Sequence, residues 1–402
     1  MSVFPSPIPK VNLRTPEVMA MVQEQVEHHY HSSLIESLRA SGSVLSTGRT
    51  TIRLAKQFGF CYGVERAIDL AYAARKVFPS ARLFLIGEII HNPEVNAQIA
   101  ALGICNLLDS NGKPHVEDLG PDDVVIVPAF GAEVPLLEEI KQLGCRIVDT
   151  TCGDVMSVWK RVRQNASEEV TSIIHGKASH EETRATASRA LGSGNGRYLV
   201  VLNLAETDRI CQYINGDIRG GNREEFLQEF AGRFSEGFDP ELHLRRLGVA
   251  NQTTMLRAET EEVQRRLREA IMARDGDAGN FRLFDTICGA TQERQDALNE
   301  LLLRPLDLLL VVGGYNSSNT THLAEMGEQK VSTWFIRNQE CLESLDRIHH
   351  FDLHEKIEIV THQRWLPDRD LQIAITAGAS CPNNLIEEVI LRILSLRGEE
   401  LP

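Results

Sequence analysis

The chain lacks any apolar run long enough to cross a membrane. Its strongest apolar stretch, residues 306–312, has the length of a strand and contains Asp307, whereas a membrane-spanning helix needs about 20 apolar residues. The N-terminus also lacks the basic, apolar and small-residue order of a secretion signal, and its acidic residues argue against a transit peptide: Glu17, Glu24 and Glu27. We therefore expect a cytoplasmic protein with no membrane partner.

Positive charge is also scarce. The chain has 42 basic and 56 acidic residues, which gives a net charge of −14 at pH 7. This field repels nucleic acid and anionic membrane surfaces, so neither is expected as a partner. An anionic ligand would need a local pocket lined by cations or amide groups.

Closely spaced cysteine pairs are missing, although the chain has eight cysteines. In the cytoplasm such cysteines are thiols or metal ligands more often than disulfides. Structural zinc normally takes four ligands from close pairs, so the spacing argues against it. A convincing nicotinamide or flavin fingerprint is absent too, so electrons for any redox reaction must come from elsewhere.

What is present indicates an α/β fold. The 402 residues, 42% of them hydrophobic, can bury a sizeable core in two or three domains. Short β-rich apolar runs alternate with longer helical patterns, which is typical of mostly parallel sheets. The expected strands cover residues 82–86, 124–127, 171–174, 198–202, 308–312, 356–360 and 372–375.

Two segments stand apart from this pattern. Residues 1–50 are polar and end in a Ser/Gly/Thr-rich stretch, so we interpret them as an N-terminal extension. Its histidines His28, His29 and His31 have no cysteine or carboxylate to complete a metal site, so we expect a solvated helix or disordered tail. Residues 206–247 are rich in charge and carry Gly220-Gly221.

Polar residues cluster directly after five of the apolar runs. Ligands bind outside the carboxyl ends of parallel strands, so these loops could all face one crevice, although each loop alone could be an ordinary turn or helix cap. The loops cover residues 87–92, 175–182, 251–254, 313–319 and 376–380.

A weak internal repeat places single cysteines at similar positions. Residues 149–153 and 285–289 share four of five residues around Cys152 and Cys288, and residues 58–63 around Cys61 are a looser third copy. Each cysteine follows an apolar run and precedes a helical pattern. The repeat predicts three domains around a shared centre, divided as 51–150, 151–284 and 285–402.

Three thiolates from three such units could bind one metal centre, and soft sulfur ligands select zinc or iron–sulfur. A cubane cluster with only three thiolates leaves one iron open to a substrate oxygen, which indicates catalysis. We interpret four other cysteines as small core residues: Cys105, Cys145, Cys211 and Cys341. Cys381 lies beside a candidate ligand loop but has no counterpart in the repeat.

Taken in order along residues 51–388, the motifs resemble one known family, the 4-hydroxy-3-methylbut-2-enyl diphosphate reductases, also called the IspH/LytB family. The shared motifs are Gly59-Phe60-Cys61-Tyr62-Gly63-Val64, His91-Asn92-Pro93, Thr151-Cys152, His180-Glu181-Glu182, Gln252-Thr253-Thr254, Ile287-Cys288, Asn316-Ser317-Ser318-Asn319 and Ala377-Gly378-Ala379-Ser380.

The resemblance implies a trefoil of three α/β domains around a central [4Fe–4S] cluster held by Cys61, Cys152 and Cys288. It also implies reductive dehydroxylation of the allylic diphosphate to isopentenyl and dimethylallyl diphosphates, the last step of the methylerythritol phosphate pathway of isoprene biosynthesis. The residues implied for the diphosphate are His91, His180, Ser317, Ser318, Asn319 and Ser380. Hydroxyl, amide, imidazole and backbone N–H donors suit this role in an acidic protein.

By the same resemblance, Glu182 and Thr253 serve the substrate hydroxyl. Breaking the C–O bond leaves an oxygen that must be protonated, and Glu182 is the expected proton source. From the residues alone, Glu182 could equally be a helix-start carboxylate that interacts with the helix dipole. The resemblance further implies a ferredoxin or flavodoxin as electron donor, and a plastid stroma in place of the cytoplasm if the source is eukaryotic.

The chain departs from the common bacterial pattern at Phe130, where a phosphate-binding histidine is expected, and at Gly153, where proline usually follows the cysteine. Residues 206–247 interrupt the resemblance and look like an insertion that adds surface helices. With this insertion and the N-terminal extension, the departures resemble the plant and cyanobacterial branch of the family. Two other readings remain open: a quinolinate-synthase-like cluster enzyme, and a non-catalytic iron–sulfur redox sensor. The sensor would not require Glu182 and Thr253.

Overall fold

The computed structural model describes residues 13–217, 221–284 and 286–401. The chain divides into two compact units, the first formed by residues 1–114, 122–126 and 289–402 and the second by residues 115–121 and 127–288. Gly220 of the predicted insertion and Asp285 of the repeat lie outside the described residues.

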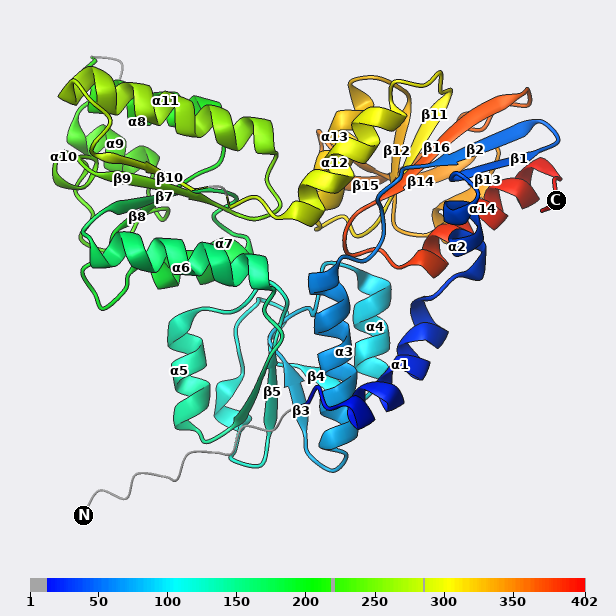
Figure 1. Ribbon diagram of the computed structural model, residues 1–402, viewed down its shortest axis with the longest axis horizontal. Helices are drawn as coiled ribbons and strands as arrows, with labels where there is room; N and C mark the ends of the chain where they lie inside the picture. Colours follow the sequence, from blue (N-terminus) through cyan, green and yellow to red (C-terminus); the bar gives the residue numbers. More distant parts are fainter. Residues whose placement is uncertain (1–12, 218–220, 285, 402) are drawn as a thin grey trace. The chain divides into compact units, whose positions relative to one another are not determined.

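The first unit is built on a five-stranded sheet. Its order is β1 (Val44–Thr47), β2 (Thr50–Leu54), β16 (Leu371–Ala377), β11 (Leu308–Val312) and β12 (Thr333–Ile336). Only the β1–β2 hairpin is antiparallel. Figure 1 shows α12 (Gly289–Leu301) and α13 (Ser318–Glu328) on one side, and α2 (Ser33–Ala40) and α14 (Asn383–Arg397) on the other.

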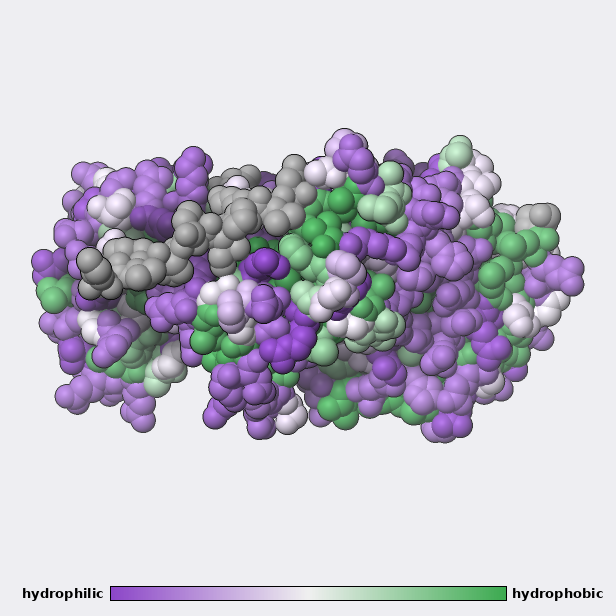
Figure 2. Space-filling model, turned by 90° about the horizontal axis from the view of Figure 1, so that it is seen from below, coloured by the Kyte–Doolittle hydropathy of each residue, from purple (hydrophilic) through white to green (hydrophobic). Residues whose placement is uncertain are grey.

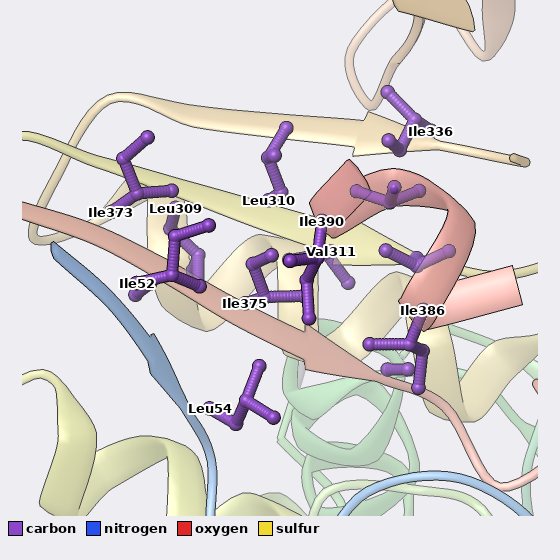
Figure 3. Packing of buried hydrophobic residues seen from close by; sticks show 14 of the residues in the cluster. Ile52, Leu54, Leu309, Leu310, Val311, Ile336, Ile373, Ile375, Ile386 and Ile390 are labelled. Atoms are coloured by element: carbon purple, nitrogen blue, oxygen red, sulfur yellow. The ribbon is translucent and has the colours of Figure 1, made fainter. Parts of the chain in front are cut away.

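Both faces of this sheet are buried, which explains why β11 is a continuous apolar run. Figure 3 shows the branched side chains of β2, β11 and β16 packed with Ile386 and Ile390 of α14. The core therefore lies directly beneath the loops that follow β11 and β16.

A smaller antiparallel sheet completes this part of the chain. It contains β13 (Leu342–Ser344), β14 (Arg347–Asp352) and β15 (Ile357–Thr361). The strand predicted at 356–360 is thus confirmed, but its assignment to a parallel sheet is wrong. The connection from β14 to β15 is too short for the crossover that parallel strands require.

A second parallel arrangement in the first unit has β3 (Leu83–Leu85) between β4 (Ile104–Asn106) and β5 (Val124–Val127). The helices α3 (Tyr62–Val77) and α4 (Pro93–Ala101) belong to this region. Asn92 caps α4 by accepting a hydrogen bond from the N–H of Val95 at 3.2 Å, and Pro93 stands at the first helical position. The cap fixes where the His91 loop ends.

The N-terminal segment is helical, with one side exposed to solvent and the other packed. Helix α1 (Pro16–Tyr30) buries Val22 and Tyr30, and His29 Nδ1 lies 2.7 Å from the hydroxyl of Tyr72 in α3. The prediction of a helix is confirmed from residue 16 onward. The prediction of a solvated helix holds for His28 and His31, which are exposed, whereas the side of α1 that carries Val22 and Tyr30 is packed. Residues 1–12 lie outside the described part.

The second unit contains a fully parallel sheet in the order β10 (Phe281–Leu283), β9 (Leu247–Asn251), β7 (Thr171–His175) and β8 (Tyr198–Val201). Figure 1 shows α8 (Leu204–Ile214) and α11 (Arg257–Asp275) on one face, and α6 (Gly153–Ser167) and α7 (Glu181–Ala190) on the other. The unit also contains α5 (Val134–Gln142) and β6 (Arg146–Asp149).

The insertion predicted at 206–247 does form helices: the rest of α8, α9 (Arg223–Glu229) and α10 (Pro240–His243). They are more than surface additions, because Phe226 and Phe230 are fully buried, with ring centroids 4.7 Å apart. These rings belong to the apolar core that also contains β8 and β9 residues. Residues 218–220 lie outside the described part.

No helix among the described residues is long and apolar enough to cross a membrane. Figure 2 shows one face of the molecule, on which hydrophilic residues predominate and hydrophobic residues form separate patches.

Candidate active site

Three of the predicted polar loops meet in the first unit. Gly378 donates its N–H to the carbonyl of Val312 at 3.3 Å, and Ser380 Oγ donates to the carbonyl of His91 at 3.1 Å. Glycine is needed where the loops touch, since a side chain at Gly314 would collide with the His91 carbonyl and one at Gly378 with Thr320. The loops after β3, β11 and β16 are therefore one interlocked group.

The start of α13 presents donors in this group. Ser317 caps the helix by accepting a hydrogen bond from the N–H of Thr320 at 3.4 Å, and Ser318 is the first helical residue. Asn319 is buried; its Oδ1 accepts from the N–H of Ala379 at 3.0 Å. Its Nδ2 has no hydrogen-bond partner among the described residues. A helix N-terminus with a buried, available amide donor is suited to an anion.

His91 is held by an acidic neighbour. Its Nδ1 lies 3.0 Å from Glu88 Oε2, and Asn316 Nδ2 donates to the same oxygen at 2.7 Å. A carboxylate only accepts, so this contact favours the tautomer of His91 with its proton on Nδ1, a nitrogen that also lies 3.3 Å from Asn316 Nδ2. In a neutral ring Nε2 would then be an acceptor, and donation to a phosphate oxygen requires a second proton on His91.

Cys61 lies next to the same loops. It occupies the N-cap position of α3 without using its side chain as a cap, and its N–H donates to the carbonyl of Ala379 at 3.3 Å. The backbone of Cys61 is thus bonded to the residue that directly precedes Ser380.

In the second unit, Glu182 and Thr253 are in direct contact. Glu182 Oε1 accepts from the backbone N–H of Thr253 at 2.6 Å, and Oε2 accepts from Thr253 Oγ1 at 3.0 Å. Both residues are buried. The structure therefore brings together the two residues predicted to serve the substrate hydroxyl, although they are far apart in sequence.

His180 caps the helix on which Glu182 lies. Its Nδ1 accepts from the N–H of Glu182 at 3.1 Å, so a neutral His180 carries its proton on Nε2. His180 can donate from Nε2 without a second proton, in contrast to His91.

Of the two remaining repeat cysteines, Cys288 contacts this pair and Cys152 contacts the Phe130 loop. Cys288 donates its N–H to the carbonyl of Thr253 at 3.3 Å, and Cys152 donates its N–H to the carbonyl of Ala129 at 2.8 Å. Cys152 is at the N-cap position of α6 without a side-chain cap, and Cys288 directly precedes α12. None of the eight cysteines, all of which lie in the described ranges, forms a disulfide.

Phe130 lies beside His180, with ring centroids 6.2 Å apart. Its loop is fixed by Arg189, which donates to the carbonyl of Ala132 at 2.7 Å and stacks over the ring of Trp159. Burial, and then repulsion from Arg163, lower the pKa of Arg189 to about 10. Arg189 therefore remains a cation near neutral pH behind the Phe130 loop.

The other cysteines divide by environment. Cys145 and Cys341 are buried and Cys211 is partly buried, as expected of core residues, whereas Cys105 is exposed and its assignment to the core is wrong. Cys105 lies in β4, whose burial is confined to its first residue. Cys381 is fully buried, and burial raises the pKa of its thiol, which argues against a thiolate there.

The structure thus groups the predicted residues within each unit. His91, Ser317, Asn319, Ser380 and Cys61 belong to the interlocked loops of the first unit. The second unit brings together His180, Glu182, Thr253 and Cys288. That all five loops face one crevice stays a prediction.

Three residues that orient the others lie in the predicted loops, but the sequence alone assigned them no role. Glu88 holds His91, and Asn316 holds Glu88. Gln252 ties the two loops of the second unit together, because its Oε1 accepts from the N–H of Lys177 at 3.1 Å and from Thr183 Oγ1 at 3.2 Å. The spacing of Glu88 three residues before His91 was the available signal.

Fold and loops together define an α/β protein that presents thiols, hydroxyls, an amide and imidazoles at the carboxyl ends of parallel strands. The family model described as "LytB protein" matches residues 52–394, and the chain belongs to this family. The resemblance found in the sequence is therefore confirmed.

Curated relatives agree with this assignment. The chain is 47% identical over 387 residues to the 4-hydroxy-3-methylbut-2-enyl diphosphate reductase of Gloeobacter violaceus, covering 94% of this chain and 91% of the relative. It is 46% identical over 380 residues to the enzyme of the same name from Thermosynechococcus vestitus, covering 94% and 92%. Both relatives are cyanobacterial, in agreement with the predicted branch.

Two solved structures are similar in fold. One is described as (E)-4-hydroxy-3-methyl-but-2-enyl diphosphate reductase, the terminal enzyme of the non-mevalonate pathway; it is 25% identical with a TM-score of 0.52, covering 87% of this chain and 100% of that one. The other, the reductase from Plasmodium falciparum, has a TM-score of 0.62 at 21% identity, covers 86% of this chain and 89% of that one, and supports the fold alone.

Family membership implies an iron–sulfur cluster. The local chemistry of the three repeat cysteines fits this group. Each stands at the start of a helix, where backbone N–H groups favour negative charge on sulfur. Neither the Cys61 side chain nor the Cys152 side chain forms a helix-capping hydrogen bond.

Proposed function

We propose that this chain reduces (E)-4-hydroxy-3-methylbut-2-enyl diphosphate to isopentenyl and dimethylallyl diphosphates. The allylic C–O bond breaks, two electrons and two protons are consumed, and the hydroxyl leaves as water. The observation that carries the proposal is the buried Glu182, bonded twice to Thr253, in a chain that belongs to the LytB family.

The thiolates of Cys61, Cys152 and Cys288 would hold a [4Fe–4S] cluster, one per chain. When bound, such a cluster supplies electrons and, at the iron without a thiolate, a Lewis acid for the substrate oxygen. Support comes from their shared placement at helix starts. We also propose the trefoil arrangement of domains 51–150, 151–284 and 285–402 around it.

The diphosphate would be bound by Ser317, Ser318, Asn319 and Ser380 together with His91 and His180. The buried Nδ2 of Asn319 supports this role, because a buried donor without a partner costs about 1–3 kcal/mol. A diphosphate oxygen would remove that cost. The donors are mostly neutral, so selectivity for the anion depends on N–H and O–H groups directed at it.

Glu182 would donate the proton that the leaving oxygen requires, and Thr253 would orient it. In the present structure Thr253 donates twice to the carboxylate. A protonated Glu182 would reverse one of these interactions, with its O–H as donor and Thr253 Oγ1 free to contact the substrate hydroxyl.

Electrons would come from a ferredoxin or flavodoxin, and we propose a cytoplasmic location. The acidic net charge of −14 means that an acidic donor protein would need a local basic surface for docking.

Anaerobic turnover tests the proposal. Reconstituted protein, the hydroxylated diphosphate, dithionite and a viologen should yield both products, whereas a redox sensor would show a cluster but no turnover. A fully loaded cluster without product formation would contradict the proposed activity.

A further inference from the structure

The loop that carries Cys61 is held by residues that precede the family-matched region. The family model begins at residue 52, yet α1 and α2 both contact the loop of residues 58–61. Two independent contacts, one from each helix, define the connection.

The contact from α2 is made by Arg39. Its Nη2 donates to the carbonyl of Phe58 at 2.9 Å and to Asn383 Oδ1 at 3.3 Å. Its guanidinium also lies over the Phe58 ring, 4.3 Å from the centroid. One planar cation thus fixes both the carbonyl and the ring of a single residue.

A second cation acts on the next residue of the loop. The buried Arg294 of α12 donates to the carbonyl of Gly59. Gly59 has φ +84°, and a side chain there would lie 2.8 Å from Asn383 Oδ1. Two arginines, Arg39 and Arg294, therefore hold the neighbouring carbonyls of Phe58 and Gly59. The backbone conformation at Gly59 is one that only glycine adopts readily.

The contact from α1 is aromatic. The ring of Tyr30 lies 5.3 Å from that of Phe60, the residue just before Cys61. The Tyr30 hydroxyl is 3.3 Å from that of Tyr72 in α3, the helix that Cys61 begins. Helix α1 is thereby tied to both sides of Cys61.

We propose that α1 and α2 form a clamp that holds Cys61 in its ligand position, with Arg39 as the main positioning residue. The role in cluster retention rests on the proposed function. A loop free to move would expose its thiolate and lose iron faster, because ligands held in place by their surroundings bind metal more tightly.

The test uses full-length protein with Arg39→Met and Arg39→Lys, and Arg49→Met as matched control. Arg49 belongs to the same unit, but its partners are Asp368 and Asp370. Two quantities are measured: hydrogen–deuterium exchange of the backbone amides of residues 59–61 in metal-free protein, and the rate of iron extraction by a chelator after anaerobic reconstitution.

For Arg39→Met we expect both rates to rise about tenfold or more, as for loss of a charged hydrogen bond. Arg39→Lys keeps the charge but loses the planar donor, so we expect an intermediate effect, and Arg49→Met should match wild type. Rates within about twofold of wild type for Arg39→Met would overturn the clamp.

If Arg39→Met fails to fold, Tyr30→Leu provides the second variant, and unchanged amide exchange in the 59–61 segment would again overturn the clamp. Failure of the proposed function is distinguishable from failure of the clamp. Wild-type protein that binds no iron would refute the cluster, whereas the exchange measurement on metal-free protein tests the clamp alone.

Discussion

The His91 loop in the first unit and the His180 loop in the second contain the same residue types but use them differently. Each has a histidine and a glutamate within three residues. In the first, Glu88 accepts from His91; in the second, Glu182 accepts from Thr253 while His180 accepts from the helix backbone. One glutamate contacts a histidine, and the other contacts Thr253 and is the residue that we propose as proton donor.

The comparison teaches that hydrogen-bond partners, not residue types, assign roles. A glutamate whose oxygen is shared by His91 and Asn316 is a positioning group. A buried glutamate whose carboxylate accepts from a rotatable hydroxyl can exchange donor and acceptor roles with that hydroxyl when it is protonated. Variants of the repeat cysteines, Glu182, Glu88 and Phe130 test this difference in role, and their expected effects decrease in that order.

The largest effect is expected from the loss of a thiol that we propose as a cluster ligand. We expect Cys61→Ser, Cys152→Ser and Cys288→Ser each to lose most bound iron and activity, because a second iron then lacks a protein ligand. Iron content after anaerobic reconstitution measures this. The exposed Cys105→Ser and the buried Cys341→Ser should keep the cluster. Loss of iron in Cys145→Ser but not in Cys152→Ser would contradict the ligand assignment.

The next largest effect is expected from Glu182→Gln, which changes only the His180 loop. The amide keeps the size and most hydrogen bonds but cannot donate the required proton, so we expect kcat to fall about 10²–10⁴-fold with the cluster retained. Dithionite with a viologen avoids the protein donor as a limiting step. If Glu182 were only a helix-start carboxylate, Glu182→Gln would lower the stability of the fold by about 1 kcal/mol or less. A kcat within about threefold of wild type would remove it from the mechanism.

Glu88→Gln tests whether Glu88 has a different role from Glu182. It removes the carboxylate that fixes the Nδ1 proton of His91 without touching substrate. We expect KM for the diphosphate to rise about threefold to tenfold, and kcat to change little, since only binding is weakened. Glu325→Gln is the matched control, because Glu325 forms a similar pair with His322 in the same unit, at 2.8 Å. A kcat loss as large as that of Glu182→Gln would show that the two glutamates do not differ in role.

Phe130→His should have the smallest effect. Phe130 contacts His180, so a histidine there would add a donor beside the proposed diphosphate. We expect a tolerated change and an unchanged or modestly lower KM. A large rise in KM would place Phe130 outside this role, and loss of fold would show that its contribution is to the core.

Sequence predicted the parallel strands and the polar loops well, because both-face burial produces continuous apolar runs such as that of β11. It could not predict that Glu182 meets Thr253, since that contact depends on β7 and β9 being neighbours. Nor could the sequence predict that Tyr30 and Arg39 contact the Cys61 loop. The extension is polar in composition, and only tertiary packing shows which side of α1 is buried. Cys105 was misjudged because β4 leaves all but its first residue outside the core.

The most direct test of the central claim is Mössbauer spectroscopy of anaerobically reconstituted, iron-57-labelled protein with and without (E)-4-hydroxy-3-methylbut-2-enyl diphosphate. We expect a four-iron cluster in which one iron changes its signal when the diphosphate is added, and the same change in Glu182→Gln. A cluster whose spectrum is unaffected by saturating diphosphate, or a protein that assembles no four-iron cluster, would contradict it.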